Sequence, residues 1–283
     1  MRPSVLAFGE VLWDLFPGEA HLGGAALNFA AHFALQGGEA WMLSALGRDE
    51  LGEKALSRMK EYGLNTSLVE IRDLPTGSVR VTFDGAGQPR YEIESDTAYD
   101  DLPGAPAGNW DALYFGSLAL RGEANRRTLE CLLREHSFRE VFVDINLRQP
   151  FVFRENVLPG LENATILKVS DEELPLLAKT VLEKETATPA ELAKAFPQIR
   201  EILLTRGSDG AERYDCAAGG TVFCPAEKVS SVSPVGAGDS FSAVYLHRRL
   251  TGLSPEEALF AASRVAAFVV TRTGAVPTDV PKP

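Results

Sequence analysis

The stretch SPVGAGDSFSAVYLHRRL, residues 233–250, joins a loop of small residues to a segment with helical spacing. The Gly-Ala-Gly run at 236–238 leaves the backbone amides uncovered, and a helix from Gly238–Asp239 to Leu250 directs its positive end toward them. Such an arrangement binds an anion, for example a phosphoryl group in transit. Helix entry alone is the plainer interpretation, since aspartate is favourable near any helix N-terminus. The stretch predicts a loop-to-helix unit with Asp239 in the first helical turn.

Upstream of this unit, short apolar runs alternate with segments of helical spacing. The runs read as buried strands of a parallel sheet and are Val5–Phe8, Trp41–Leu46, Leu113–Phe115, Val141–Ile145, Thr165–Val169 and Ile202–Thr205. The helical segments are Ala25–Leu35, Glu50–Tyr62, Glu123–His136 and Asp171–Lys179. Downstream, Ser254 is a helix N-cap with Pro255 in the first turn, and the helix is expected to run to Thr271. The alternation predicts an α/β domain with helices on both faces of the sheet.

One region, Ser78–Ser95, departs from this pattern because its apolar and polar residues alternate strictly. The alternation covers Val79–Phe83 and Tyr91–Ile93, and Asp84–Gly87 supplies turn residues between them. A hairpin with one apolar face is therefore expected. We interpret it as a small sheet that stands off the main body, where it covers a ligand or pairs with a second subunit. An ordinary edge hairpin of the main sheet is the alternative.

Composition limits the classes of partner. The chain has 283 residues, of which 45% are hydrophobic, enough for one large core or two modest ones. Its formal charge is -11 and its pI is about 5.0, which argues against nucleic acid and anionic membranes as partners. Any phosphate binding must come from local backbone amides or a few placed cations.

The cysteines, the N-terminal residues and the lengths of the apolar runs indicate where in the cell the protein is expected. Cys131, Cys216 and Cys224 lack the paired spacing of a zinc or redox site, so we expect buried thiols. The opening MRPSVLAFGE holds no signal-peptide core, and no apolar run approaches the roughly 18 to 20 residues of a membrane span. The sequence predicts a soluble, cytoplasmic protein.

A second glycine motif lies near the N-terminus, in His21-Leu22-Gly23-Gly24-Ala25-Ala26-Leu27-Asn28. The paired glycines let a small polar ligand approach the backbone, and the Asn28 amide offers both a donor and an acceptor to sugar hydroxyls. Close packing before an alanine-rich helix is the alternative.

The two glycine motifs together resemble the ribokinase or PfkB family of carbohydrate kinases over essentially the whole chain. Weaker motifs follow in the family's order: Gly9-Glu10 with Asp14, Asp144-Ile145-Asn146-Leu147-Arg148, Thr205-Arg206-Gly207-Ser208-Asp209-Gly210 and Thr271-Arg272-Thr273-Gly274-Ala275. The resemblance implies a ribokinase-like three-layer α/β/α domain over residues 1–283, with a mostly parallel central sheet. It also implies a small β-sheet lid, with strands drawn from about 10–20 and 76–97.

The resemblance further implies transfer of the γ-phosphoryl group of ATP to a sugar hydroxyl, with Mg²⁺. Asp239 matches the family's catalytic base, and the amides of Gly236, Ala237 and Gly238 match its anion hole. An ordinary aspartate is too weak to deprotonate a free hydroxyl, so proton transfer must come late in the reaction. The chain has no Walker-type motif, which removes the P-loop alternative.

The binding residues are also taken from the family's motifs. The positions that match the sugar site are Asp14, Gly23, Gly24 and Asn28. Arg148 reaches the substrate or the nucleotide phosphates, or else forms a salt bridge with a carboxylate such as Asp144. The positions that match the nucleotide site are Ser170, Thr205, Gly207, Gly210 and Ser263, although a hydroxyl bonded to its own helix is the plain interpretation of Ser263.

Two departures from the family pattern affect the ions. Ser233-Pro234 replaces the usual Asp-Thr, whose carboxylate belongs to the monovalent-cation site, so K⁺ activation is expected to be weak or absent. The family's Asn-x-x-Glu reads Ser170-Asp171-Glu172-Glu173, which keeps Glu173 as the residue that orders magnesium-bound water. Acidic residues at a helix start are the alternative explanation for this run.

Segments such as Gly9–Pro17, His21–Ala30 and Phe115–Arg121 resemble the fructokinase branch of the family. The resemblance implies D-fructose as the acceptor and fructose 6-phosphate as the product. Ribose, 2-keto-3-deoxygluconate or a nucleoside are alternative acceptors, and a non-catalytic sugar-binding relative is an alternative of another class. The apolar face of the hairpin leads us to expect a homodimer through the lid.

Overall fold

The computed structural model describes residues 2–83 and 89–281. Its main sheet has nine strands in the order β13-β12-β11-β10-β9-β8-β1-β4-β5. The parallel part consists of β1 (Ser4–Phe8), β4 (Glu39–Gly47), β5 (Val69–Arg72), β8 (Ala112–Phe115), β9 (Glu140–Asp144), β10 (Ile166–Ser170) and β11 (Glu201–Thr205). The antiparallel strands β12 (Gly210–Asp215) and β13 (Gly220–Pro225) extend one edge. All six predicted strands are present in this sheet.

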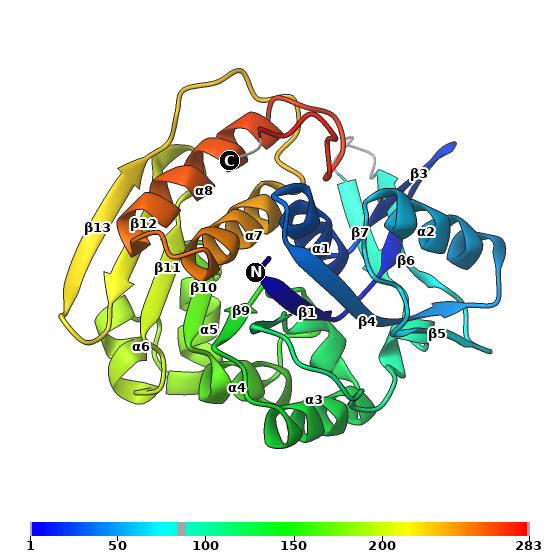
Figure 1. The fold of residues 1–283 in the computed structure, drawn as a ribbon, viewed down its shortest axis with the longest axis horizontal. Helices are drawn as coiled ribbons and strands as arrows, with labels where there is room; N and C mark the ends of the chain where they lie inside the picture. The colour runs from blue at the N-terminus through cyan, green and yellow to red at the C-terminus, as the bar shows by residue number, and fades with distance from the viewer. Residues whose placement is uncertain (1, 84–88, 282–283) are drawn as a thin grey trace.

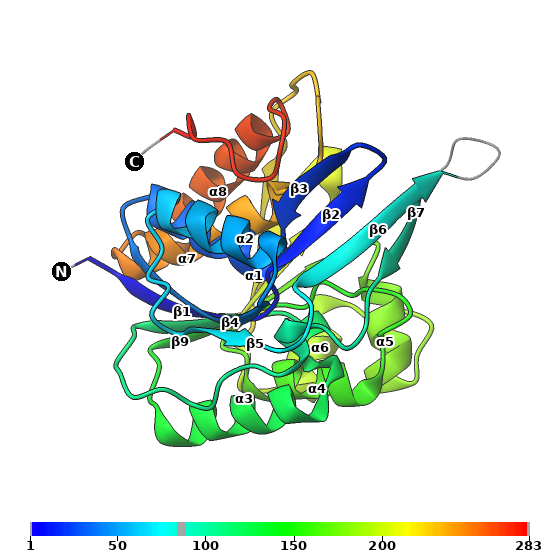
Figure 2. The same ribbon diagram turned by 90° about the vertical axis from the view of Figure 1, so that its right-hand side faces the viewer.

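Helices cover both faces of the main sheet (Figures 1 and 2). One face carries α1 (Ala25–Leu35), α2 (Glu50–Glu61), α7 (Ala237–Leu250) and α8 (Pro255–Val269). The opposite face carries α3 (Glu123–Glu135), α4 (Arg154–Asn163), α5 (Leu174–Leu182) and α6 (Pro189–Ala195). Three short 3₁₀ turns lie in the connections, η1 (Ala98–Asp100), η2 (Leu118–Arg121) and η3 (Gly207–Asp209). The predicted three-layer α/β/α fold is confirmed.

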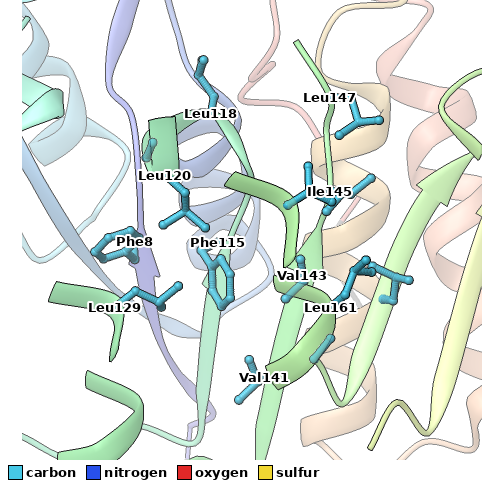
Figure 3. Close-up of a cluster of buried hydrophobic side chains, with 14 of the residues drawn as sticks. Phe8, Phe115, Leu118, Leu120, Leu129, Val141, Val143, Ile145, Leu147 and Leu161 are labelled. Atoms are coloured by element: carbon cyan, nitrogen blue, oxygen red, sulfur yellow. The ribbon is translucent and has the colours of Figure 1, made fainter. Parts of the chain in front are cut away.

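Each layer interface has its own hydrophobic core. Phe8 on β1 points to the α3 and α4 side, where it meets Phe115 and Leu129 (Figure 3), and its neighbour Ala7 faces α1. Because successive strand residues alternate between faces, a strand buried on both sides must be apolar throughout. This requirement explains the continuous apolar runs of the sequence.

A second, four-stranded sheet projects from the main body (Figure 2). Its order is β3 (Glu19–Gly23), β2 (Leu12–Phe16), β6 (Gly77–Phe83) and β7 (Pro89–Ile93). The strands from the alternating region thus belong to a separate sheet, and the edge-hairpin alternative is wrong. The predicted turn at Asp84–Gly87 lies outside the described residues. We call this four-stranded element the small sheet.

The apolar face of the small sheet is largely covered within a single chain. Val79 and Val81 are 6% and 1% exposed, and Val79 belongs to the same hydrophobic core as Phe8 and Phe115. Tyr91 on β7 is 65% exposed. The face that led us to expect a homodimer is therefore already buried at Val79 and Val81. Among the described residues of this sheet, Tyr91 is the large apolar side chain that remains exposed to a second chain.

Several element boundaries differ from the expectation. Helix α5 begins at Leu174 rather than Asp171, because the Glu173 carboxylate accepts the Ser170 N–H and holds a turn there. Helix α8 ends at Val269 rather than Thr271, because the Val270 carbonyl accepts hydrogen bonds from the loop at 232–233. The sequence patterns also missed β5, β12 and β13.

The cysteine expectation is only partly right. All three thiols are free, but only Cys224 is buried, while Cys131 and Cys216 are half-buried. Cys131 lies on α3 with Arg134 Nη2 at 3.3 Å from its sulfur, on a helix whose outer face meets solvent. Separately, none of the helices in residues 2–83 and 89–281 has the length and apolar character needed to span a bilayer.

Candidate active site

The loop-to-helix unit that opened the sequence analysis forms the centre of the site. Helix α7 begins at Ala237, one residue earlier than expected, and Gly236 is its N-cap with φ of 82°. Asp239 lies in the first turn, as predicted. A Cβ on Gly236 would lie 2.2 Å from the Ala275 carbonyl oxygen, so the loop and the C-terminal segment are in close backbone contact.

The amides at this helix start are only partly used by the protein. Ala237 N–H donates to the Pro234 carbonyl at 3.3 Å, whereas the N–H groups of Gly236 and Gly238 have no partner among the described residues. Free amides at a helix N-terminus favour an anion. The predicted anion hole therefore has donors available at Gly236 and Gly238, while Ala237 already has an acceptor.

The two glycine motifs, which are far apart in the sequence, meet through Asn28 and Asp239. Helices α1 and α7 pack side by side (Figure 1), and Asn28 Nδ2 donates to Asp239 Oδ2 at 2.8 Å. The Asn28 Oδ1 atom is buried and has no hydrogen-bond partner in the described structure. An unpartnered buried acceptor is costly, so a ligand that donates a hydrogen bond there is favoured.

The environment of Asp239 suits a general base. Loss of solvation and the nearby Asp144 carboxylate raise its pKa from an ordinary 3.8 to about 7, against the opposing effects of Asn28, Lys168 and Arg148. A base is most effective when its pKa lies near the working pH. Asp239 can therefore be ionised at neutral pH and still accept a proton.

A buried charged network lies beneath Asp239. Lys168 Nζ donates to Asp144 Oδ1 at 3.0 Å, and Ser242 Oγ donates to the other carboxylate oxygen, Asp144 Oδ2, at 2.9 Å. Burial alone would lower the pKa of Lys168, but the Asp144 and Glu173 carboxylates outweigh it and raise that pKa. Lys168 is therefore a permanent positive charge within the site.

The predicted sugar residues converge where β2, β3 and α1 meet. A Cβ on Gly23 would lie 3.2 Å from Asp14 Oδ2, and one on Gly24 would lie 2.5 Å from the Glu10 carbonyl oxygen. Glu10 is itself buried, and its Oε1 accepts the Ala25 N–H at 2.8 Å, which caps the start of α1. The Glu10 backbone leaves no room for a side chain at Gly24, and the Asp14 carboxylate leaves little room at Gly23.

Arg148 does not form the salt bridge with Asp144 that was its alternative, because Lys168 occupies that carboxylate. The Arg148 side chain is exposed and forms no ion pair within residues 2–83 and 89–281. Burial raises the pKa of Asp14, and the Arg148 charge partly opposes that rise. The same charge also lowers the pKa of Asp239. Arg148 thus acts electrostatically on both ends of the site.

The predicted nucleotide residues lie on the neighbouring strand ends. Ser170 and Thr205 are register partners at the ends of β10 and β11. Gly207 and Gly210 bound the turn after β11, which Arg206 N–H closes on the Gly210 carbonyl at 2.8 Å. Ser263 lies apart from them on α8, which packs against β12 and β13.

The Ser263 hydroxyl is not bonded to its own helix. Its Oγ is buried and has no hydrogen-bond partner in the described part of the chain. This observation contradicts the plain interpretation of Ser263 and leaves an acceptor and donor available for a ligand.

Glu173 ties two loops together. Its Oε1 accepts the Leu147 N–H at 2.7 Å and its Oε2 accepts the Ser170 N–H at 2.8 Å. Each carboxylate oxygen keeps a further lone pair. Within the described residues no group of three or more His, Cys, Asp or Glu side chains could enclose a metal. Mg²⁺ in phosphoryl-transfer sites is held largely by phosphates and water with one or two carboxylates, and Glu173 fits that donor set.

Comparison with known proteins identifies the family. The model of the pfkB family carbohydrate kinase matches residues 8–283. The chain belongs to the PfkB family of carbohydrate kinases.

Relatives of this PfkB kinase include several named fructokinases. The chain is 28% identical over 302 residues to the fructokinase of Escherichia coli, covering 98% of this chain and 96% of that protein. It is 27% identical over 309 residues to a probable chloroplastic fructokinase-6 of Arabidopsis thaliana, covering 97% and 79%.

Solved structures share the fold but differ in substrate. The fructokinase of Vibrio cholerae, bound to fructose, ADP and calcium ion, superposes with a TM-score of 0.81 at 20% identity, covering 98% of this chain and 95% of that one. The aminoimidazole riboside kinase of Salmonella enterica, bound to its riboside and an ATP analogue, has a TM-score of 0.81 at 24% identity, covering 99% and 97%. These likenesses establish the ribokinase-like fold and leave the acceptor of this PfkB kinase open.

Sequence reasoning did not assign a role to two residues of the site in this PfkB kinase. Glu10 was noted only as part of a weak motif, and Lys168 was read as one position of a buried strand. A lysine inside an otherwise apolar strand such as ILKVS (166–170) is rare without a partner, and that anomaly was the available signal.

Proposed function

We propose that this carbohydrate kinase transfers the γ-phosphoryl group of ATP to a hydroxyl of free D-fructose and yields fructose 6-phosphate. The observation that carries the proposal is the Asn28–Asp239 pair, which joins a raised-pKa carboxylate to an unpartnered amide oxygen at the helix start. The named fructokinases among the relatives support fructose, while the riboside kinase supports a nucleoside as the second candidate.

In the proposed mechanism the sugar lies between the Gly23–Gly24 turn and Asp239. Asn28 Oδ1 accepts a hydrogen bond from one sugar hydroxyl, and Asp14 accepts from another. As the new P–O bond forms, the bond between the γ-phosphorus and the ADP oxygen breaks and ADP leaves with the electron pair. Asp239 accepts the hydroxyl proton late, when bond formation has acidified the oxygen.

Charge on the transferring group is stabilised by the free amides of Gly236 and Gly238 at the N-terminus of α7. On the nucleotide side, we assign Ser170, Thr205, Gly207, Gly210 and Ser263 to ATP, and Arg148 to the phosphates or the sugar. When bound, Mg²⁺ offsets phosphate charge, and Glu173 would orient its water.

We propose weak or absent activation by K⁺. A neutral Ser233 hydroxyl, which accepts the Val235 N–H at 3.3 Å, stands where the family pattern has a carboxylate, so that donor set does not fit a monovalent cation well. Turnover in KCl is expected to equal turnover in NaCl within about twofold, since removing a favourable ligand charge weakens cation binding. Strong stimulation by K⁺ over Na⁺ would contradict this proposal.

The variant Asp239→Asn tests the assignment of the base. It keeps the shape of the side chain but cannot accept the proton, so kcat should fall by about 10²- to 10⁴-fold. The assay is ADP release from ATP and Mg²⁺ with fructose, ribose, glucose, mannose, 2-keto-3-deoxygluconate, adenosine and fructose 6-phosphate. Asp73→Asn, at a highly exposed position, is the matched control. Unchanged turnover in Asp239→Asn would overturn the assignment, and a preference for adenosine would favour the nucleoside alternative.

We also propose a cytoplasmic location, where ATP and free sugars meet, and a homodimer through the small sheet. Support for the dimer is twofold: β3 and β7 are the terminal strands of the small sheet, and Tyr91 on β7 is largely exposed. Terminal strands offer unpaired backbone groups to a second copy. The lid role is a separate proposal, and it is supported by the place of the small sheet beside the predicted sugar residues.

A further inference from the structure

Lys168 is an unusual residue for its position. It lies on β10 with 7% of its surface exposed, in a strand whose other core residues are apolar. Burying an ammonium group is costly unless its hydrogen atoms find acceptors. Lys168 has three N–H donors, yet its only hydrogen-bond partner in the described structure is Asp144 Oδ1 at 3.0 Å.

The remaining donors lie beside the anion hole. A Cβ on Gly238 would be 3.2 Å from Lys168 Nζ, so the ammonium contacts the second glycine of the loop at 236–238. The second oxygen of Asp144 accepts from Ser242 on α7, which fixes the carboxylate between β10 and the helix that carries Asp239. The network therefore holds Lys168 at the start of α7 before any ligand binds.

The charges around Lys168 come from three elements. Asp144 on β9 is paired with it, Glu173 precedes α5, and Asp239 lies in the first turn of α7. All three are carboxylates that raise the pKa of Lys168, and the only other cation that acts on Asp239 in the described part of the chain is the exposed Arg148. An anionic phosphoryl group could approach Asp239 and Asp144 only if a positive charge offsets their repulsion.

We propose that Lys168 is a further catalytic residue, whose ammonium donates a hydrogen bond to an oxygen of the phosphoryl group as it passes to the sugar. The proposal rests on the kinase site described above. Lys168 gives up no proton in this step: the phosphoryl group moves from the ADP oxygen to the sugar oxygen, and the hydroxyl proton goes to Asp239. A donor fixed in advance stabilises the transition state because it needs no reorganisation during the reaction.

The variant Lys168→Met removes the donor but leaves Asp144 buried without its partner, which by itself destabilises a protein. The double variant Lys168→Met/Asp144→Asn removes both charges, so it separates the two effects. If Lys168 is catalytic, the double variant should regain thermal stability toward wild type while kcat stays lower by about 10²- to 10³-fold. Lys168→Arg, which keeps the charge in a different shape, should retain more turnover than Lys168→Met.

Binding supplies a readout that does not depend on turnover. The variants' affinity for ADP should change little, whereas affinity for ADP with aluminium fluoride, which resembles the phosphoryl group in transit, should fall by about 10²-fold because transition-state contacts are lost. Calorimetry measures both. A double variant with kcat within threefold of wild type, or equal losses of both affinities, would show that Lys168 is only structural. Asp239→Asn is assayed alongside: if that variant keeps full turnover, it is the proposed site that fails, whatever Lys168 does.

Discussion

Asp239 illustrates how one residue's chemistry follows from its surroundings. Three neighbours, Asn28, Lys168 and Arg148, lower its pKa, but loss of solvation and Asp144 prevail and bring the pKa to about 7. Shifts of this size cluster at functional sites, and here their causes are burial and the Asp144 charge. The residue that the sequence motif marked as the base is therefore also the one that the structure tunes toward neutrality.

The pH dependence of turnover follows from this pKa. Asp239 accepts a proton only when ionised, so kcat/KM for the sugar should be constant above pH 8 and fall about tenfold per pH unit below about pH 7. An ordinary aspartate, with a pKa near 3.8, would give a flat profile down to pH 5. The measurement is kcat/KM from initial rates between pH 5 and 9 at constant ionic strength. A kcat/KM that stays constant below pH 7 would rule out a base with this pKa.

At this scale the sequence named Asn28 and Asp239 as candidate residues, and the structure brings them together, whereas sequence reasoning assigned Lys168 no role. Motif residues can be predicted because their order along the chain is itself the signal. Lys168 belongs to no such motif. The proposal for Lys168 rests on its contacts with Asp144 and Gly238, which other elements bring to it, and proximity between residues far apart in the chain leaves no local pattern in the sequence.

At the scale of elements, both ends of α7 depend on glycines with positive φ. Gly236 precedes the helix with φ of 82° and Gly252 follows it with φ of 95°. A Cβ at Gly252 would meet nothing within 4 Å, whereas one at Gly236 would collide with the Ala275 backbone. The same substitution at the two sites therefore separates backbone strain from a steric clash.

Gly236→Ala should displace the loop that carries the anion hole and lower kcat by about 10²-fold or more, because a shift of about 1 Å in a catalytic group has that effect. Gly252→Ala imposes only the strain of a positive φ, about 1 kcal/mol of unfolding free energy, and should leave kcat unchanged. Chemical denaturation and steady-state kinetics on both variants test this. Equal effects on kcat would mean that the Ala275 contact does not hold the loop.

Element boundaries were predictable where local chemistry fixes them. The α1 bounds were predicted correctly, and Ser254 caps α8 with the expected side-chain bond to the Glu257 N–H. The predicted start of α5 was wrong because the Glu173 carboxylate accepts hydrogen bonds from the Leu147 and Ser170 amides. Leu147 belongs to another loop, so this contact leaves no local pattern in the sequence. The antiparallel strands β12 and β13 were not predicted because they are only partly buried and lack the continuous apolar run that was sought.

For the whole molecule, the small sheet relates the site to assembly. It begins next to the sugar residues, since Leu12 on β2 pairs with Gly23 on β3, and it extends away from the main sheet (Figure 2). Its inner face is covered at Val79 and Val81 by the chain itself. Tyr91 on β7 is the register partner of Val81, so its exposed ring lies on the same apolar face, at the edge of the sheet. What a second copy can bind is thus the outer part of that face together with the β7 edge.

The variant Tyr91→Lys tests the homodimer. A lysine on an edge strand disfavours pairing between chains, and loss of a buried aromatic contact weakens an interface by about 2 kcal/mol or more. Wild type should scatter light as a dimer at micromolar concentration, and Tyr91→Lys should shift toward the monomer. Phe153→Lys, which changes a 52% exposed residue just before α4, should stay dimeric. A wild-type monomer at both micromolar and assay concentrations would reject the dimer, and dimers of both variants would place the interface elsewhere on the molecule.

If the small sheet both covers the sugar and joins two chains, the dimeric state should also raise sugar affinity, so KM for the sugar should increase in Tyr91→Lys and stay unchanged in Phe153→Lys.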